Sequence, residues 1–146
     1  MINNENIMYM YCNVLEQTGP ESVLDIGLFY RHIGGVSRTI LNSQVSGECF
    51  ITGIDLENLK SYGVYNTIYD EIIKADDMGE LSDKEYDLAV FLDKKITGLK
   101  RKNMFDFVKQ NCKCVFAYET DELYLENWGN KRKLNVNNVN GILAWR

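Results

Sequence analysis

The sequence predicts an α/β protein in which helices cover a mostly parallel sheet. Apolar strands alternate with helices along the chain at a spacing that implies right-handed crossovers. The first strand reads Ser22-Val23-Leu24-Asp25-Ile26 and leads through Gly27 into a turn, and a second apolar strand ends in Gly53-Ile54-Asp55. This order places a glycine turn and an acid at the carboxyl ends of neighbouring strands, where open α/β sheets form their ligand crevice.

The first half of the chain predicts two helices and three strands around these segments. Within residues 1–18, apolar residues recur at helical spacing, which indicates an amphipathic helix packed on the sheet; they are Ile7, Met10, Tyr11, Val14 and Leu15. Gly19 and Pro20 are a typical helix stop. We expect strands at 22–26, 49–55 and 71–74, with a helix at 35–43 and a short one at 56–62 between them.

The second half predicts two further strands, at 87–92 and 114–118, with a helix at 102–111 between them. Residues 127–146 are rich in asparagine until Gly141-Ile142-Leu143-Ala144-Trp145, which reads as a final edge strand. Because so little chain follows the fifth strand, we expect the domain to be truncated at its C-terminal end. Missing strands there would leave a sheet edge exposed.

Length and composition fit a single domain over 1–146, since 146 residues with 45% hydrophobic side chains are enough for one core. A net charge of -5 argues against a nucleic-acid surface. We interpret the short basic clusters at 94–95, 100–102 and 131–133 as solvated loops and helix ends. The N-terminus lacks signal-peptide features, no apolar run reaches membrane-spanning length, and the dispersed cysteines suit reduced thiols. These features predict a cytoplasmic protein without a metal site.

Short segments along the chain form an ordered series. Val23-Leu24-Asp25-Ile26-Gly27 is followed by Gly34-Gly35-Val36-Ser37-Arg38, Gly53-Ile54-Asp55, and the runs 69–76 and 86–93. Together they resemble the motifs of the class I S-adenosylmethionine-dependent methyltransferases over residues 20–120. The resemblance implies that family's Rossmann-like fold, a three-layer α/β/α sandwich. No G-x-G-x-x-G follows the first strand, which disfavours an NAD-dependent oxidoreductase.

The resemblance also implies an S-adenosylmethionine pocket at the carboxyl ends of strands one to four. Gly27, Gly34 and Gly35 would let backbone amides approach the methionine end of the cofactor. Asp55 would accept hydrogen bonds from both ribose hydroxyls. An acid that ends an otherwise apolar strand has few structural reasons to be there, so Asp55 is the main candidate.

Four further acids belong to the candidate site. Asp76 and its neighbour Asp77 would accept the adenine amino group, or would instead cap a following turn. Asp25 contacts the ligand indirectly or pins the turn by accepting backbone N–H groups. Asp93 ends the strand-four motif.

Two departures from the family pattern bear on the site. Leu28-Phe29-Tyr30-Arg31-His32-Ile33 stands where the family has a short glycine loop. Without a gap, Phe29 occupies the second-glycine position; with an insertion, Gly34 and Gly35 take the glycine roles. His32 is the single histidine and lacks an evident orienting partner. The run after strand four has neither the histidine nor the glutamate that many relatives place beside the methyl acceptor.

Two functions therefore stay open. The first is an S-adenosylmethionine-dependent methyltransferase with an unknown acceptor and no assigned catalytic residue. The alternative is a non-catalytic relative that keeps the fold and acts as a binding or assembly module. We also expect a homodimer, through the exposed edge or the N-terminal helix, or a protein partner.

Overall fold

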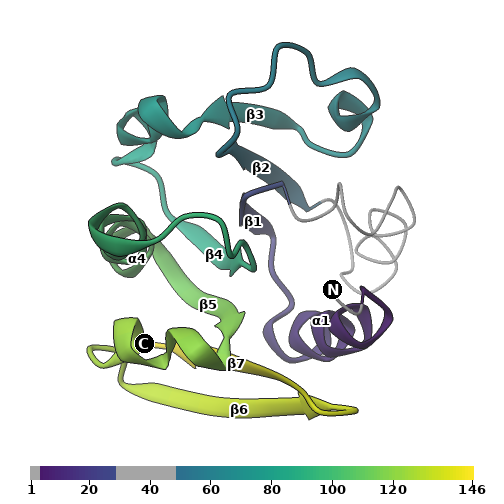
Figure 1. Cartoon of the computed structure of the whole chain (residues 1–146), viewed down its shortest axis with the longest axis vertical. Helices are drawn as coiled ribbons and strands as arrows, with labels where there is room; N and C mark the ends of the chain where they lie inside the picture. Colours follow the sequence, from purple (N-terminus) through teal and green to yellow (C-terminus); the bar gives the residue numbers. More distant parts are fainter. Residues whose placement is uncertain (1–3, 29–48) are drawn as a thin grey trace.

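The computed structural model describes residues 4–28 and 49–146, which form one seven-stranded sheet with helices packed against it (Figure 1). The α-helices in these residues are α1 (Asn4–Thr18) and α4 (Gly98–Asn111). The strands are β1 (Ser22–Ile26), β2 (Phe50–Asp55), β3 (Glu71–Lys74), β4 (Tyr86–Phe91), β5 (Cys112–Tyr118), β6 (Asn130–Val136) and β7 (Val139–Trp145). Three 3₁₀ segments connect them: η1 (Gly63–Thr67), η2 (Ala75–Leu81) and η3 (Glu119–Leu125).

The sheet has the strand order β3-β2-β1-β4-β5-β7-β6. The β1–β2, β1–β4, β2–β3 and β4–β5 pairs are parallel, whereas β7 is antiparallel to both β5 and β6. The chain moves outward from β1 to β3 and then returns to β4 on the other side of β1. The order therefore reverses between β1 and β4, and the predicted Rossmann-like fold class is confirmed.

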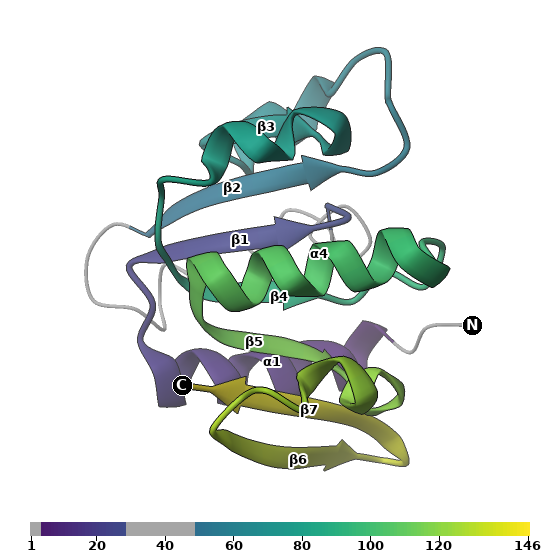
Figure 2. The ribbon, with the colours of Figure 1, turned by 90° about the vertical axis from the view of Figure 1, so that its left-hand side faces the viewer.

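Helices α1 and α4 lie on opposite faces of the sheet (Figure 2), and an apolar cluster lies between the sheet and each of them. Helix α1 packs on one face, against alternate residues such as Val23, Leu88 and Phe116. Helix α4 packs on the opposite face together with η2 and η3, against the intervening residues such as Leu24 and Ala89. Strands buried on both faces read as nearly continuous apolar runs, which is why the sequence located β1, β2 and β4 well.

Helix α1 follows the predicted pattern closely. Its five predicted apolar residues are all 3% exposed or less. The helix ends at Thr18, and the next residue, Gly19, has φ +52° and donates its N–H to the carbonyl of Leu15 at 2.9 Å. This left-handed residue followed by Pro20 is the stop that the sequence indicates.

The C-terminal strands correct the sequence-based expectation of missing strands. β6 and β7 form a hairpin whose two turn residues, Asn137 and Asn138, have φ +49° and +68°, as a type I′ turn requires. β7 is the predicted last strand, but it lies between β5 and β6 and is not at the edge. Between β5 and β6, η3 is the only regular element.

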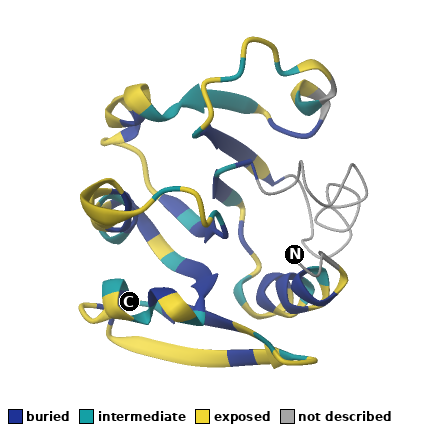
Figure 3. Cartoon of the chain, viewed as in Figure 1, coloured by how far each residue is buried: buried dark blue, intermediate teal, exposed yellow. Residues whose placement is uncertain are grey.

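The edge on this side of the sheet is β6, most of which is exposed (Figure 3). This strand carries three consecutive positively charged residues, Lys131, Arg132 and Lys133. Charged side chains on an edge strand commonly prevent unwanted pairing with another strand. The predicted pairing of two copies through this edge stays a prediction.

Two expectations about the connections need correction or cannot be placed. The short helix predicted at 56–62 is wrong: that stretch is irregular, and η1 begins after it. The helix predicted at 35–43 lies outside the described residues. In the part of the chain that the structure describes, no helix is both long and apolar enough to cross a membrane.

Candidate functional site

The carboxyl ends of β1, β2 and β4 meet where the strand order reverses, and four of the eight predicted site residues lie here: Asp25, Gly27, Asp55 and Asp93. Gly27 follows β1 with φ +98°, which favours glycine. A Cβ added to Gly27 would lie 2.9 Å from the Cβ of Asp93 and 3.3 Å from Cδ1 of Leu56. The structure thus brings Gly27 and Asp93 together, and it fills the space beside the glycine with protein atoms.

Asp55, the main candidate, lies at the end of β2 with its side chain only 1% exposed. Its Oδ1 accepts the N–H of Glu57 at 2.9 Å, and its Oδ2 accepts the N–H of Leu59 at 2.8 Å. The Tyr62 hydroxyl donates to the same Oδ2 at 3.1 Å. The carboxylate therefore holds the loop that follows its own strand.

The charge on Asp55 is stabilised within this loop. Burial alone would raise the pKa of Asp55, but the three hydrogen bonds and the Lys74 ammonium outweigh it and lower that pKa below the usual aspartate value. Lys74 Nζ lies 3.6 Å from Oδ2 and donates to the Leu59 carbonyl at 3.0 Å. Asp55 is thus an ionised carboxylate with partners on both oxygens.

Asp25 is also buried within the protein. It lies in β1 with no exposed surface, and the Tyr69 hydroxyl donates to its Oδ2 at 2.5 Å. Tyr69 also packs close to the backbone of β2, because a Cβ at Gly53 would lie 2.8 Å from its ring. Asp25 is therefore tied to the segment that precedes β3.

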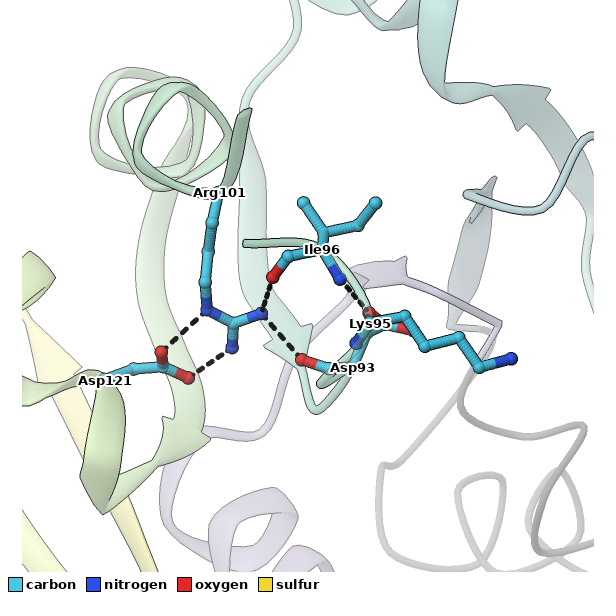
Figure 4. A network of polar contacts seen from close by, with 5 residues as sticks. All are labelled: Asp93, Lys95, Ile96, Arg101 and Asp121. Carbon is cyan, nitrogen blue, oxygen red and sulfur yellow. Dashed lines mark hydrogen bonds and ion pairs between the residues drawn. The ribbon is translucent and has the colours of Figure 1, made fainter. Parts of the chain in front are cut away.

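The loop after β4 is held by Asp93 and by a buried arginine (Figure 4). Asp93 Oδ1 accepts the N–H groups of Lys95 at 2.8 Å and Ile96 at 3.1 Å. Arg101 Nη1 donates to the carbonyls of Asp93 at 2.7 Å and Ile96 at 3.0 Å. These bonds fix the path of the loop beside the end of β1.

Arg101 is paired with Asp121 in the interior of the protein. Its Nε donates to Oδ1 at 2.8 Å and its Nη2 to Oδ2 at 2.5 Å, while both side chains are less than 10% exposed. The guanidinium also lies 4.6 Å from the centre of the Phe91 ring. The expectation that cluster 100–102 is simply solvated is wrong for Arg101, which joins the β4 loop, α4 and η3.

An ion pair connects the loops after β2 and β4. The Lys95 ammonium contacts the Glu57 carboxylate, and both residues come from loops that flank the end of β1. Glu57 also donates its N–H to Asp55, and Lys95 donates its N–H to Asp93. The ion pair therefore connects the turn held by Asp55 to the turn held by Asp93, across the carboxyl end of β1.

The other predicted residues follow the neighbouring strand β3 or lie outside the description. Asp76 and Asp77 come just after Lys74, which pairs with Asp55 at the carboxyl end of β3, and both are exposed in the first turn of η2. Gly34, Gly35, His32 and the two alignments of the 28–35 loop fall within the undescribed residues 29–48. No group of three metal-ligating side chains occurs within 4–28 and 49–146.

One buried polar atom at this edge has no partner. The Tyr118 side chain ends β5 with 6% exposure, and within the described chain its hydroxyl makes no hydrogen bond. Lys94 Nζ lies 4.4 Å from the centre of its ring. Burial, followed by the negative charges of Asp93 and Asp121, raises the pKa of Tyr118, so its hydroxyl stays protonated at neutral pH.

Sequence reasoning missed the groups that bind the predicted acids. Tyr69 begins one of the quoted motifs, yet nothing in its spacing pairs it with Asp25. Arg101 is hidden between two solvated lysines, and its burial follows only from its position on the inner side of α4. Tyr62 ends the stretch that the sequence predicted as a short helix, and that prediction gave no reason to pair it with Asp55.

Comparison with known proteins identifies the fold. No family model matches the chain, and no curated protein matches it by sequence. An O-methyltransferase from Bacillus cereus in complex with SAH superposes with a TM-score of 0.68 at 9% identity, over 100% of this chain and 82% of that one. A ribosomal protein L11 methylase from Lactobacillus delbrueckii subsp. bulgaricus gives 0.62 at 16% identity, over 100% and 80%.

A third match is larger than this chain. The T. thermophilus 16S rRNA N2 G1207 methyltransferase, in complex with AdoMet and guanosine, gives a TM-score of 0.68 at 15% identity. All of this chain is covered, but only 44% of that protein. At such identities the likeness concerns the fold alone. The chain has the fold of the class I S-adenosylmethionine-dependent methyltransferases.

Proposed function

We propose that this protein is a non-catalytic relative of the class I methyltransferases that acts as a binding or assembly module. The observation that carries the proposal is the state of Asp55, whose side chain is 1% exposed and has partners on both oxygens. In this reading, the acid that would hold the cofactor's ribose serves the stability of the β2 loop.

The described residues do not fit the ribose of S-adenosylmethionine. Two ribose hydroxyls need two accessible acceptors, whereas Asp55 already accepts the N–H groups of Glu57 and Leu59 and the hydroxyl of Tyr62. A hydrogen bond to a charged group contributes about 1.5–3 kcal/mol, so exchanging several of them for ribose brings little net gain. Cofactor binding here would require residues 56–62 to leave their present positions.

The neighbouring positions support the same proposal. The space beside Gly27 holds Asp93 and Leu56, and the Glu57–Lys95 ion pair spans the loops on either side. Asp25 is bonded to Tyr69 within the core. At each of these places the predicted site residues contact other protein atoms, which supports a structural role for them.

Isothermal titration calorimetry tests the proposal directly. We expect no binding heat from S-adenosylmethionine or S-adenosylhomocysteine at ligand concentrations up to about 1 mM. This result would exclude a dissociation constant below about 1 mM, which corresponds to about 4 kcal/mol of favourable binding free energy. Far-ultraviolet circular dichroism of the same sample verifies that the protein is folded. Micromolar binding that Asp55→Ala abolishes and that Asp83→Ala, at an exposed residue outside the candidate site, leaves intact would overturn the proposal.

A second candidate is a methyltransferase that binds S-adenosylmethionine after the β2 loop moves, with an unknown acceptor. The Tyr118 hydroxyl, which has no hydrogen-bond partner among the described residues, favours it, because buried polar atoms without partners are uncommon and a ligand atom could supply the missing bond. In this case Tyr62→Phe, which removes one bond to Asp55, would strengthen cofactor binding. Under the first proposal, Tyr62→Phe creates no binding.

A further inference from the structure

A second candidate site lies away from the carboxyl edge, on the face of the sheet that α1 covers. A cavity of about 550 Å³ opens between the C-terminal turn of α1 and the strands β5, β7 and β6. Its lining residues are Gln17, Thr18, Cys114, Arg132, Leu143 and Trp145. Strand pairing brings the last four together, because Cys114 lies opposite Trp145 and Arg132 opposite Leu143.

The cavity combines an apolar wall with a single charge. Leu143, Trp145 and Cys114 provide aliphatic, indole and thiol surface, and Arg132 is the only charged residue among the described residues that line the cavity. The volume falls within the range of small-molecule sites, about 300–1,000 Å³. An aromatic wall beside one guanidinium matches a flat ligand that carries a negative charge.

Several hydrogen-bond donors of the lining have no partner. Among the described residues, neither the Arg132 guanidinium, the Gln17 amide nor the Trp145 indole N–H takes part in a hydrogen bond or ion pair. The Thr18 hydroxyl, by contrast, donates to the Val14 carbonyl at 2.8 Å. The unused groups are donors, and none of the described lining residues is acidic, so the lining favours a ligand rich in acceptors.

We propose that this cavity binds an aromatic carboxylate, with the ring against Trp145 and Leu143 and the carboxylate on Arg132. Arginine forms bidentate hydrogen bonds with carboxylates, which orient the ligand and increase its affinity. The proposal goes beyond the function proposed above. It concerns a different part of the sheet, so that either can fail without the other.

The two tryptophans of the chain make the test specific, since Trp145 lines the cavity and Trp128 is buried in the core on the opposite face. The probe is 4-hydroxybenzoate, and its neutral analogue 4-hydroxybenzamide is the matched ligand. In ¹H–¹⁵N NMR spectra of the full chain, we expect 4-hydroxybenzoate to shift the Trp145 indole N–H signal and to leave that of Trp128 in place. The amide should bind at least about tenfold more weakly, which corresponds to one lost charge-assisted contact.

Two variants on β6 distinguish binding in this cavity from nonspecific electrostatic attraction of the negatively charged probe. Arg132→Gln should weaken 4-hydroxybenzoate binding about tenfold or more, whereas Lys131→Gln, on the opposite face of β6, should change it less than about twofold. Both side chains are exposed, so both variants should keep the fold. No shift of Trp145 at about 10 mM probe, equal binding of the amide, or equal losses in the two variants would each overturn the proposal.

Discussion

Two buried aspartates at the carboxyl edge of the sheet are satisfied in contrasting ways. Asp55, after β2, receives its hydrogen bonds from residues two, four and seven positions later in the chain. Asp121, after β5, is bound by Arg101, which is twenty positions earlier and on α4. The first network holds one loop, whereas the second joins three segments. At this edge, hydrogen bonds between residues close in sequence hold the loop after β2, whereas an ion pair between residues distant in sequence holds the segments around β5.

The largest expected effect comes from breaking the long-range pair. Arg101→Met would leave Asp121 buried without its partner, which should cost about 3–5 kcal/mol of unfolding free energy. The double variant Arg101→Met/Asp121→Leu should recover most of that loss, because no buried charge is left. Urea unfolding followed by circular dichroism measures both. A loss below about 1 kcal/mol in the single variant would contradict the buried pair.

Asp55→Asn should have the next largest effect. The substitution removes the charge that three donors and Lys74 stabilise, and we expect a loss of about 1–3 kcal/mol at pH 7. Asp77→Asn, on an exposed residue in η2, is the matched control and should be neutral. Equal effects of the two variants in urea unfolding would show that Asp55 has no special structural role.

The pH dependence of the same variant sharpens the prediction. The pKa of Asp55 is lowered in the folded state, so its stabilising effect is complete above the unfolded-state value near about 4. That effect disappears as the pH falls through the lower folded-state pKa. The stability difference between the wild type and Asp55→Asn should therefore be constant between about pH 5 and 7 and shrink below about pH 4. A difference that grows in acid would contradict this assignment.

Tyr69→Phe tests the third buried acid, Asp25, and should cost about 1–2 kcal/mol because the carboxylate loses a hydroxyl donor at 2.5 Å. The ring itself is kept, so packing against Gly53 should be unchanged. Tyr9→Phe, on an exposed position of α1, serves as the control. Thermal unfolding measures both variants, and equal changes in their unfolding temperatures would contradict a stabilising bond from Tyr69 to Asp25.

The smallest effect should come from the exposed ion pair between Glu57 and Lys95. Lys95→Gln is expected to change the unfolding free energy by less than about 0.5 kcal/mol, because both side chains reach solvent. The change should vanish at about 1 M salt, where surface charges are screened. A loss as large as that of Asp55→Asn would mean that the bridge, and not Asp55, fixes the two loops.

The sequence predicted the parallel part of the fold well and the C-terminal hairpin poorly. β1, β2 and β4 are buried on both faces, so their apolar runs are easy to recognise. β6 is an exposed edge strand of asparagine, lysine and arginine, and its hairpin depends on the positive φ of Asn137 and Asn138. Such a turn is not distinguishable by composition from an asparagine-rich loop.

The sequence predicted where the candidate acids lie along the strands, but not which residues form hydrogen bonds with them. The sequence placed Asp25 within the first strand, Asp55 at the end of the second and Asp93 just after the fourth, and the structure agrees. Their partners come from segments whose paths only the tertiary structure defines, such as Tyr69 before β3 and Tyr62 after an irregular stretch. An acid at a strand end is equally suited to accept a ligand hydroxyl or a backbone N–H, so residue type alone cannot choose between the two roles.

Hydrogen exchange at the amides of Glu57 and Leu59 tests the central claim most directly, because those N–H groups donate to Asp55. In wild-type protein at neutral pH, we expect both amides to be protected and their exchange rates to be unchanged by saturating S-adenosylhomocysteine. Asp55→Asn should accelerate both. If S-adenosylhomocysteine instead shifts the two amide signals and removes their protection, Asp55 has turned to the cofactor, and the non-catalytic reading is contradicted.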